Sequence, residues 1–198
     1  MKMVYINEKL QSMMTGERFD HTERTRDIAL EIASCQIIDK EKVEITALLH
    51  DCAKEMPKDE MKRWIHKYSI VLDEIEEKEP GLWHQIVSAI IAERDFGVKD
   101  QEILQAISIH STGDANMSLL AKIIYIADYL ETWPNESMMQ KAKEDIDLAL
   151  REVMIKKINY IFNKSAFLHP KSVSAYNWLA KKLDTDLQRM NTEEIFRH

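Results

Sequence analysis

Four histidines and two aspartates in this sequence are of types that could bind metal ions. They are His21, His50, Asp51, His84, His110 and Asp128. Imidazole and carboxylate together suit Fe, Mn, Co or Zn, whereas Mg prefers oxygen ligands and soft metals recruit cysteine. Six such groups exceed what one tetrahedral ion needs. Two ions about 3.5–4 Å apart, with one carboxylate bridging them, would use all six and would suit hydrolysis of a phosphate ester or anhydride.

The stretch "ALLHDCAKEMP" places His50 directly before Asp51 near the end of a predicted helix. Adjacent helix residues project about 100° apart, so His50 and Asp51 do not lie on one narrow stripe of the helix. Both side chains can still reach a metal ion that lies beside the helix. Taken alone, each histidine is better interpreted as a core or surface residue. Their joint occurrence with two aspartates favours a metal centre.

Basic residues accompany the predicted ligands. Arg18 and Arg24 lie three residues either side of His21 and share its helix face, and Lys54 follows His50 by four. These cations would meet the oxygens of an anionic substrate. The alternative, that they are surface charges making ordinary ion pairs, is equally consistent with the sequence.

Two further residues could line a polar site. Thr112 belongs to "HSTGDANMS", which offers hydroxyls and, in Gly113, a residue able to take positive φ. An unremarkable helix connection fits that stretch equally well. His169 precedes Pro170 at a helix start and either has a structural role or reaches a ligand from the C-terminal region.

Apolar residues recur at helical spacing through most of the chain, and glycine and proline fall between these segments. The prediction is an all-α fold, with Asp100 as a helix N-cap. The acidic segment 69–82 is predicted to be a loop that could approach or cover its surroundings. Helices are predicted at 3–14, 18–37, 40–55, 57–68, 83–96, 100–110, 117–131, 137–163 with a break, and 170–190.

Composition favours one soluble domain spanning residues 1–198. The 45% hydrophobic content can fill one core, and a net charge of −7 argues against a nucleic-acid-coating protein. No apolar run is long enough to span a membrane and no leader-like segment opens the chain, so we expect a cytoplasmic protein. Cys35 and Cys52 are too few for a disulfide framework and are expected to be reduced, mostly buried thiols.

The combination of His21, "HD" at 50 and 51, and Asp128 resembles the H…HD…D signature of the HD-domain metal-dependent phosphohydrolases. The fuller set "RFDHTERT", "ALLHDCAKEMP", "LWH", "AISIHSTG" and "KIIYIADYLE" resembles the bacterial YqeK family more narrowly. The similarity runs from about residue 17 to 180. It implies a helical HD bundle with a metal-site core at about 17–132, on which C-terminal helices at about 137–190 pack.

The resemblance also implies an activity, the symmetrical cleavage of diadenosine tetraphosphate into two ADP by a hydroxide bridging two ions. The ions would be iron, with Mn, Co or Zn as alternatives, and the protein a homodimer. One ion would be held by His21, His50, Asp51 and Asp128, and the second by His84 and His110, with Asp51 bridging. Asp51, Lys54 and Arg24 would act in catalysis, and Arg18, Arg24, Lys54, Thr112 and His169 would bind the dinucleotide or an ADP-like or GDP-like product.

One segment departs from the family pattern. The family continues Asp-Tyr-Ile-Glu-Pro after the ligand aspartate, with an arginine close behind, whereas this chain reads "DYLETWPNESMMQK" and has no basic residue before Lys141. Substrate preference and rate are the properties that this change would affect.

Two alternatives from other functional classes remain open. One is an HD-fold di-iron oxygenase of a small organic substrate, and the other is a catalytically silent nucleotide-binding module. A cyclic-dinucleotide phosphodiesterase is disfavoured because no Gly-Tyr-Pro motif occurs. A guanosine tetraphosphate hydrolase is disfavoured because it would not need His84 and His110.

Overall fold

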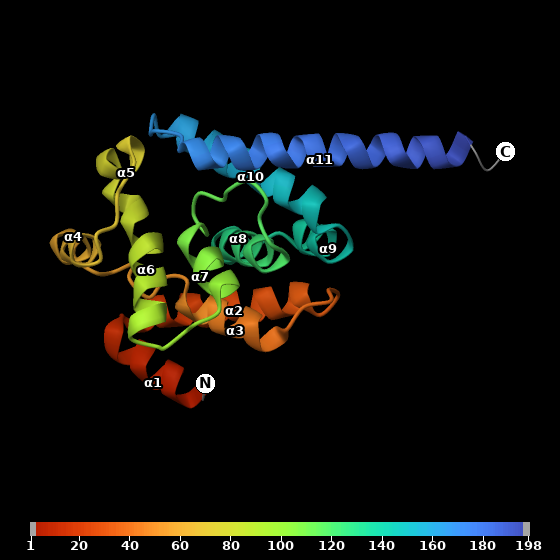
Figure 1. Ribbon diagram of the computed structural model, residues 1–198. Helices are drawn as coiled ribbons and strands as arrows, with labels where there is room; N and C mark the ends of the chain where they lie inside the picture. The colour runs from red at the N-terminus through yellow and green to blue at the C-terminus, as the bar shows by residue number, and fades with distance from the viewer. Residues whose placement is uncertain (1–2, 196–198) are drawn as a thin grey trace.

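The chain folds into α-helices joined by short connections (Figure 1). The computed structural model describes residues 3–195, with side chains described for residues 3–186. Within this part of the chain there is no strand, which confirms the predicted all-α fold. The elements are α1 (Met3–Met13), α2 (Gly16–Ala33), α3 (Lys40–Leu49), α4 (Lys58–Lys67), α5 (Glu74–Lys78), the 3-10 helix η1 (Pro80–Leu82), α6 (Trp83–Arg94), α7 (Gln101–Ser108), α8 (Leu119–Thr132), α9 (Glu136–Glu144), α10 (Ile146–Asn163) and α11 (Pro170–Ile195).

Helix α8 forms the centre of the bundle, with α2 and α3 on one side and α10 and α11 on the other (Figure 1). It begins after the N-cap Ser118, whose hydroxyl accepts a hydrogen bond from the backbone N–H of Ala121 at 3.2 Å. Ile123 and Ile124 point to different faces and both are fully buried. A helix that is apolar on most sides must be surrounded by others. Asp128, near its end, is therefore placed at the edge of the core, with its side chain 20% exposed.

The acidic segment 69–82, predicted to be a loop, instead contains α5 and η1. The carboxylate of Asp73 accepts hydrogen bonds from the N–H groups of Ile75 and Glu76, both at 2.9 Å. In return the Glu76 carboxylate accepts from the N–H of Asp73 at 2.9 Å. This reciprocal capping box stabilises a helix too short for its hydrophobic periodicity to be read from the sequence.

The expected break within 137–163 is confirmed and lies at Asp145. Its carboxylate accepts hydrogen bonds from the N–H groups of Asp147 and Leu148, both at 3.0 Å, and so starts α10 directly after α9. Asp100 is likewise confirmed as an N-cap, because its carboxylate accepts from the N–H of Glu102 at 2.9 Å.

Gly113 allows the connection between α7 and α8 to turn close to the C-terminal helices. Its φ is +67°, a left-handed conformation that residues with a Cβ rarely adopt. A Cβ at this position would lie 3.4 Å from side-chain atoms of both Ala175 and Met154. The predicted positive φ is thus confirmed, and it brings residues 110–112 toward the start of α11.

Both cysteines are free thiols, as predicted. Cys52 is buried, and burial raises the pKa of its thiol to about 12, so it stays protonated and unreactive at neutral pH. Cys35 is exposed, which corrects the expectation of mostly buried thiols, because it lies in the turn just beyond α2.

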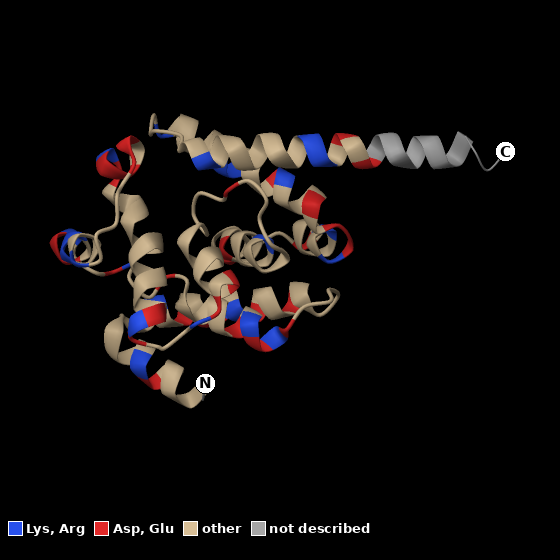
Figure 2. Cartoon of the chain, viewed as in Figure 1, with Lys and Arg blue, Asp and Glu red and all other residues tan. Residues whose placement is uncertain are grey.

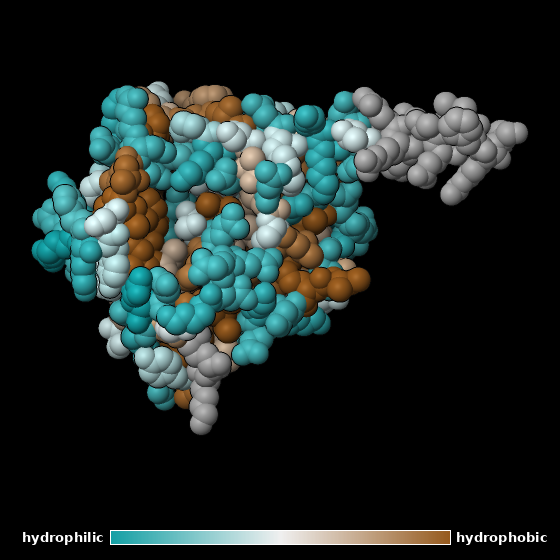
Figure 3. Space-filling model, viewed as in Figure 1, coloured by the Kyte–Doolittle hydropathy of each residue, from teal (hydrophilic) through white to brown (hydrophobic). Residues whose placement is uncertain are grey.

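Acidic and basic residues are scattered over the helices, and neither sign dominates one face in this view (Figure 2). The space-filling view shows a mainly hydrophilic surface interrupted by apolar patches (Figure 3). Ile37 and Val71 are among the exposed large apolar side chains. In the described part of the chain, no helix combines the length and the apolar character needed to cross a membrane.

Asp147 links three helices through two ion pairs, and we expect Asp147→Asn to lower the free energy of unfolding by about 1–2 kcal/mol at pH 7. Its carboxylate accepts from Lys122 of α8 at 2.6 Å and from Lys182 of α11. Burial alone would raise the pKa of Asp147, but these two hydrogen bonds outweigh it and the pKa is lowered.

Because the folded chain favours the carboxylate, this stabilisation is complete above the usual aspartate pKa of about 3.9 and is lost as pH falls through the lowered value. Urea unfolding at pH 7 and at pH 3 should therefore show a smaller difference between wild type and Asp147→Asn at the lower pH. The exposed Asp20→Asn serves as the control. An undiminished difference at pH 3 would contradict the ion-pair account.

Candidate metal centre

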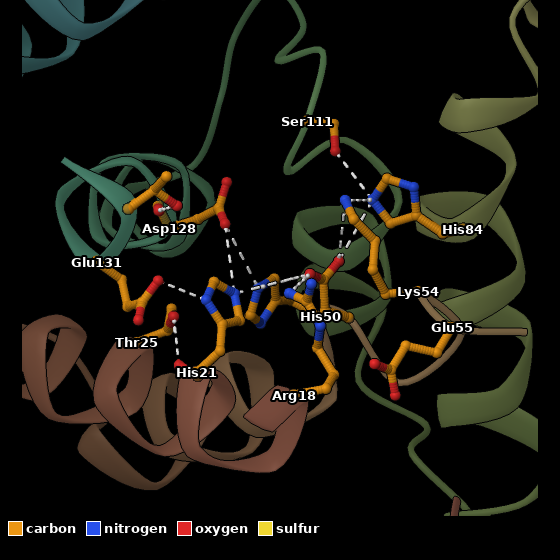
Figure 4. Close-up of polar contacts among 12 residues, drawn as sticks. Arg18, His21, Thr25, His50, Lys54, Glu55, His84, Ser111, Asp128 and Glu131 are labelled. Atoms are coloured by element: carbon orange, nitrogen blue, oxygen red, sulfur yellow. Dashed lines mark hydrogen bonds and ion pairs between the residues drawn. The ribbon is translucent and has the colours of Figure 1, made fainter. Parts of the chain in front are cut away.

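The six predicted ligands come from separate elements that meet at one end of α8. His21 lies on α2, Asp128 on α8 and His84 in the first turn of α6 (Figure 4). The predicted helix 40–55 ends at Leu49, so His50 and Asp51 occupy the turns that follow it. The predicted helix 100–110 likewise ends at Ser108, which places His110 just beyond α7.

The first group comprises His21, His50, Asp51 and Asp128. The Nε2 atom of His21 lies 3.7 Å from Asp51 Oδ2 and 3.8 Å from Asp128 Oδ1. The Nε2 atom of His50 lies 3.8 Å and 3.7 Å from the same two oxygens. Ligand bonds of about 2.0–2.2 Å in a tetrahedral site put ligand atoms roughly 3.4 Å apart. These four atoms are therefore spaced to hold one ion.

The second group comprises Asp51, His84 and His110. Asp51 Oδ1 lies 3.3 Å from His84 Nε2 and 3.2 Å from His110 Nε2. Asp51 thus faces the first group with Oδ2 and the second with Oδ1. A carboxylate in this position could bridge two ions.

Local backbone geometry fixes the orientation of three of the imidazoles. The Nδ1 atoms of His50, His84 and His110 each lie within hydrogen-bond distance of the carbonyl three residues earlier. The partners are Ala47 at 2.6 Å, Gly81 at 2.6 Å and Ile107 at 2.8 Å. Because a carbonyl can only accept, Nδ1 of the neutral ring carries the proton and the lone pair of Nε2 points into the centre.

The centre leaves buried polar atoms without hydrogen-bond partners. They include Nε2 of His21, Nε2 of His50 and Oδ1 of Asp51. In addition, Nε2 of His84 lies 3.1 Å from Nε2 of His110, so two lone pairs face each other. Leaving such atoms unsatisfied is costly. One cation in each group would satisfy these acceptors, so the donor set fits metal ions.

The protonation of most of these groups also suits metal binding. Burial lowers the pKa of His84 to about 3, and burial likewise lowers the pKa values of His110 and His21, so these rings are neutral at pH 7. His50 differs, because the Asp51 and Asp128 carboxylates outweigh burial and raise its pKa.

The two aspartates are ionised. Burial alone would raise the pKa of Asp51, but His50, His110 and other neighbouring groups together outweigh this effect and hold the pKa well below its usual value. Burial would also raise the pKa of Asp128, and Lys157 and His50 lower it instead. Neutral imidazoles and ionised carboxylates are the forms that bind metal.

Residues 18–133 match the HD domain family. The chain belongs to the HD domain family. All six residues of the two groups lie within the matched part.

Relatives of this HD domain extend over most of the chain. A Bacillus subtilis protein named symmetrical bis(5'-nucleosyl)-tetraphosphatase is 34% identical over 86% of this chain and 93% of its own length. A Halalkalibacterium halodurans protein of the same name is 33% identical over 84% and 90%. A crystal structure described as a predicted HD superfamily hydrolase involved in NAD metabolism, from Clostridium acetobutylicum, superposes with a TM-score of 0.86 at 31% identity, covering 92% of this chain and 98% of that one.

Arg18 and Lys54, predicted to meet substrate, both contact the centre. Arg18 Nη1 donates to Asp51 Oδ2 at 3.1 Å. Lys54 Nζ donates to His84 Nε2 at 3.0 Å and lies 3.8 Å from Asp51 Oδ1. Both side chains are partly exposed, so their charges stand between the buried carboxylate and the solvent.

Arg24 is linked to the metal centre through Glu131, a residue that was not predicted from the sequence. Nε and Nη2 of Arg24 both lie 2.7 Å from Glu131 Oε1. The other oxygen of Glu131 accepts from His21 Nδ1 at 2.5 Å and holds Nε2 toward Asp128 (Figure 4). The spacing in the sequence could have indicated Glu131, because it follows Asp128 by three residues and so shares its helix face. Its partner His21 could not be identified in this way.

Glu131→Gln is expected to weaken metal binding about ten-fold or more, because a carboxylate partner orients a ligand histidine and raises its basicity. Competition with a chromogenic chelator measures the affinity. Glu136→Gln changes a nearby exposed carboxylate and is the control. Equal resistance of Glu131→Gln and wild type to the chelator would contradict this role.

Thr112 is buried beside the centre, but its hydroxyl is engaged within its own loop, where it donates to the Gly113 carbonyl at 3.0 Å. Its own carbonyl accepts from Ser172 at 2.8 Å, which ties the loop to α11. The neighbouring Ser111 instead faces the centre, with Oγ 3.1 Å from His84 Nε2 (Figure 4).

His169 belongs to a third group of histidine and carboxylates, with Asp73 and Glu76. Its Nδ1 accepts the backbone N–H of Lys171 at 3.0 Å, so the neutral ring carries its proton on Nε2, 2.9 Å from Asp73 Oδ2. The Lys171 ammonium lies 3.3 Å from Glu76 Oε1. The Lys171 ammonium thus already pairs with one of the two carboxylates, and the group ties α5 to the start of α11. The predicted contact of His169 with substrate stays a prediction.

Proposed function

We propose that this HD domain protein is a metal-dependent phosphohydrolase that cleaves diadenosine tetraphosphate symmetrically into two ADP. Water adds to one of the two central phosphorus atoms, and the bond from that phosphorus to the central bridging oxygen breaks. Each ADP therefore keeps two phosphates. The observation that carries the proposal is the Asp51 carboxylate, which faces one histidine group with each oxygen. The names of the relatives support the choice of substrate.

The ligand assignment follows the two groups. His21, His50 and Asp128 would hold one ion, His84 and His110 would hold the other, and Asp51 would contact both. Such ions supply Lewis-acid polarisation of phosphate oxygens and activation of water. The imidazoles of His21, His84 and His110 stay neutral, all four rings are fixed in orientation, and the carboxylates offset the positive charge.

The basic residues would act on the phosphate chain. Arg18 and Lys54 lie at the Asp51 carboxylate and are partly exposed, so an entering phosphate can replace their contacts with the protein. Charges placed beside the reacting phosphorus stabilise the negative charge that develops during displacement. Arg24 would act indirectly, by holding Glu131 in contact with His21.

We also propose iron as the bound metal, as the family resemblance implies, and both groups offer nitrogen and oxygen donors that suit it. Mn, Co and Zn accept the same donors. The homodimer implied by the family resemblance and the cytoplasmic location stay predictions, and sedimentation of the purified protein tests the first of them.

Product analysis tests the proposed activity. The protein is supplied anaerobically with Fe(II), incubated with diadenosine tetraphosphate, and the products are separated by anion-exchange chromatography. ADP as the only nucleotide product supports the proposal. Equal amounts of AMP and ATP would refute symmetrical cleavage, and intact substrate with metal bound would refute the activity itself. Oxygen uptake with a small organic substrate would then favour the oxygenase.

A further inference from the structure

A cavity of about 470 Å³ opens beside the metal centre, between the end of α8 and one face of α10. Its lining includes Ser111, Tyr129, Trp133, Lys156, Lys157 and Tyr160. Cavities of a few hundred Å³ with apolar walls and a few polar groups are typical of small-molecule sites.

Two residues that line the cavity also contact the metal centre. Ser111 Oγ lies 3.1 Å from Nε2 of His84, in the second group. Lys157 Nζ lies 3.4 Å from Oδ2 of Asp128, in the first group. The close-up shows Ser111 and Asp128 on opposite sides of the centre (Figure 4). The cavity therefore lies directly beside both groups.

Aromatic rings line the outer part of this cavity. The Trp133 ring lies 5.0 Å from that of Tyr129 and 5.8 Å from that of Tyr160, measured between ring centroids. Trp133 is 44% exposed and Tyr160 is 51% exposed, so each keeps an open ring surface. Open aromatic faces beside a phosphate-binding region are characteristic of nucleobase stacking sites.

Basic residues lie between these rings and the centre. Lys157 is bound to Asp128 and also lies 4.0 Å from the centroid of the Tyr125 ring, while Lys156 lies beside it in the cavity wall. The segment after Asp128 has no basic residue before Lys141, so Lys157 of α10 supplies a positive charge that the adjoining sequence does not. A cation in this place suits the phosphates next to a nucleoside.

We propose that this cavity binds one adenosine half of the substrate, with the base stacked on Trp133 and Tyr160 and the adjoining phosphates at Lys157. The central phosphorus atoms then lie at the metal groups. The assignment rests on the proposed function and deepens it, because it identifies residues that determine the preference for a nucleoside. Trp133 is a binding residue here, and Lys157 both binds phosphate and positions Asp128.

Calorimetric titration of the metal-loaded protein with ADP, and separately with inorganic pyrophosphate, tests the proposal. Trp133→Ala should weaken ADP binding about ten-fold, the loss expected for one stacked base, and should leave pyrophosphate binding unchanged. Trp133→Phe should retain most of the ADP affinity. Phe162→Ala removes an exposed aromatic ring of α10 that does not line the cavity and should bind both probes as wild type does.

The two probes separate the possible failures. Wild-type affinity of Trp133→Ala for ADP would overturn the stacking site, even if the wild type cleaves diadenosine tetraphosphate. An equal loss of ADP and pyrophosphate affinity would also overturn it, because the effect would then not concern the base. If the wild type fails to cleave the dinucleotide but ADP binding depends on Trp133, the proposed activity fails and the nucleoside site stands.

Discussion

Asp51→Ala is expected to lose both metal ions and to lower turnover by at least about a thousand-fold. Removal of a residue that only hydrogen-bonds to a ligand already lowers metal affinity or activity 10–100-fold. Asp51 is itself a predicted ligand, and it is the residue that both groups share. The substitution also leaves the four imidazoles without a carboxylate between the two groups. Metal content after gel filtration, measured by inorganic mass spectrometry, and the initial rate of ADP formation check both parts of the prediction.

A matched control separates loss of the bridge from loss of any carboxylate. Asp73→Asn changes a carboxylate of the third group while keeping a side chain that can cap α5. This variant should keep two ions and near wild-type turnover. Two ions retained by Asp51→Ala, with circular dichroism showing an intact fold, would contradict the bridging role.

His84→Ala and His110→Ala are each expected to lose one ion and to keep the other. Both residues contact Asp51 Oδ1, whereas the first group uses Oδ2. Turnover should fall at least about a hundred-fold, because one ion cannot clamp the substrate as a pair does. A metal titration should show one equivalent of metal bound tightly to each variant. An activity assay at the end of the titration should show little turnover.

The exposed His66→Ala is the control for this pair of variants, because it removes an imidazole of α4 at the protein surface. It should bind two ions and react as wild type does. If His84→Ala and His110→Ala lost both ions together, the two groups would have to be treated as one indivisible site. If neither lost any, the second group would not be a metal site.

The helices could be predicted from the sequence wherever local chemistry determines them. Asp100 was predicted as an N-cap and Gly113 as a residue able to take positive φ, because both effects act within one turn of the chain. The end of α3 at Leu49 was missed because no glycine or proline occurs between Leu49 and Pro57, although the backbone of residues 50–55 changes to turns. Helix α5 was missed because its stability comes from reciprocal caps on a very short segment.

The residue types of the centre could be selected from sequence, but its supporting contacts could not. The joint occurrence of four histidines and two aspartates indicated the centre, whereas the contact of Glu131 with His21 depends on the packing of α2 against α8. Lys157 comes from a helix that the motifs do not reach, and its contact with Asp128 depends on how α10 lies across α8. Tertiary packing therefore supplied both residues.

Anomalous diffraction from crystals loaded with Mn(II) tests the central claim most directly, because it locates each ion without reference to activity. We predict two peaks about 3.5–4 Å apart, one on each side of the Asp51 carboxylate. One should lie within bonding distance of His21 and Asp128, and the other within bonding distance of His84 and His110. A single peak, or a peak at Asp73 and His169 with none at Asp51, would contradict the account.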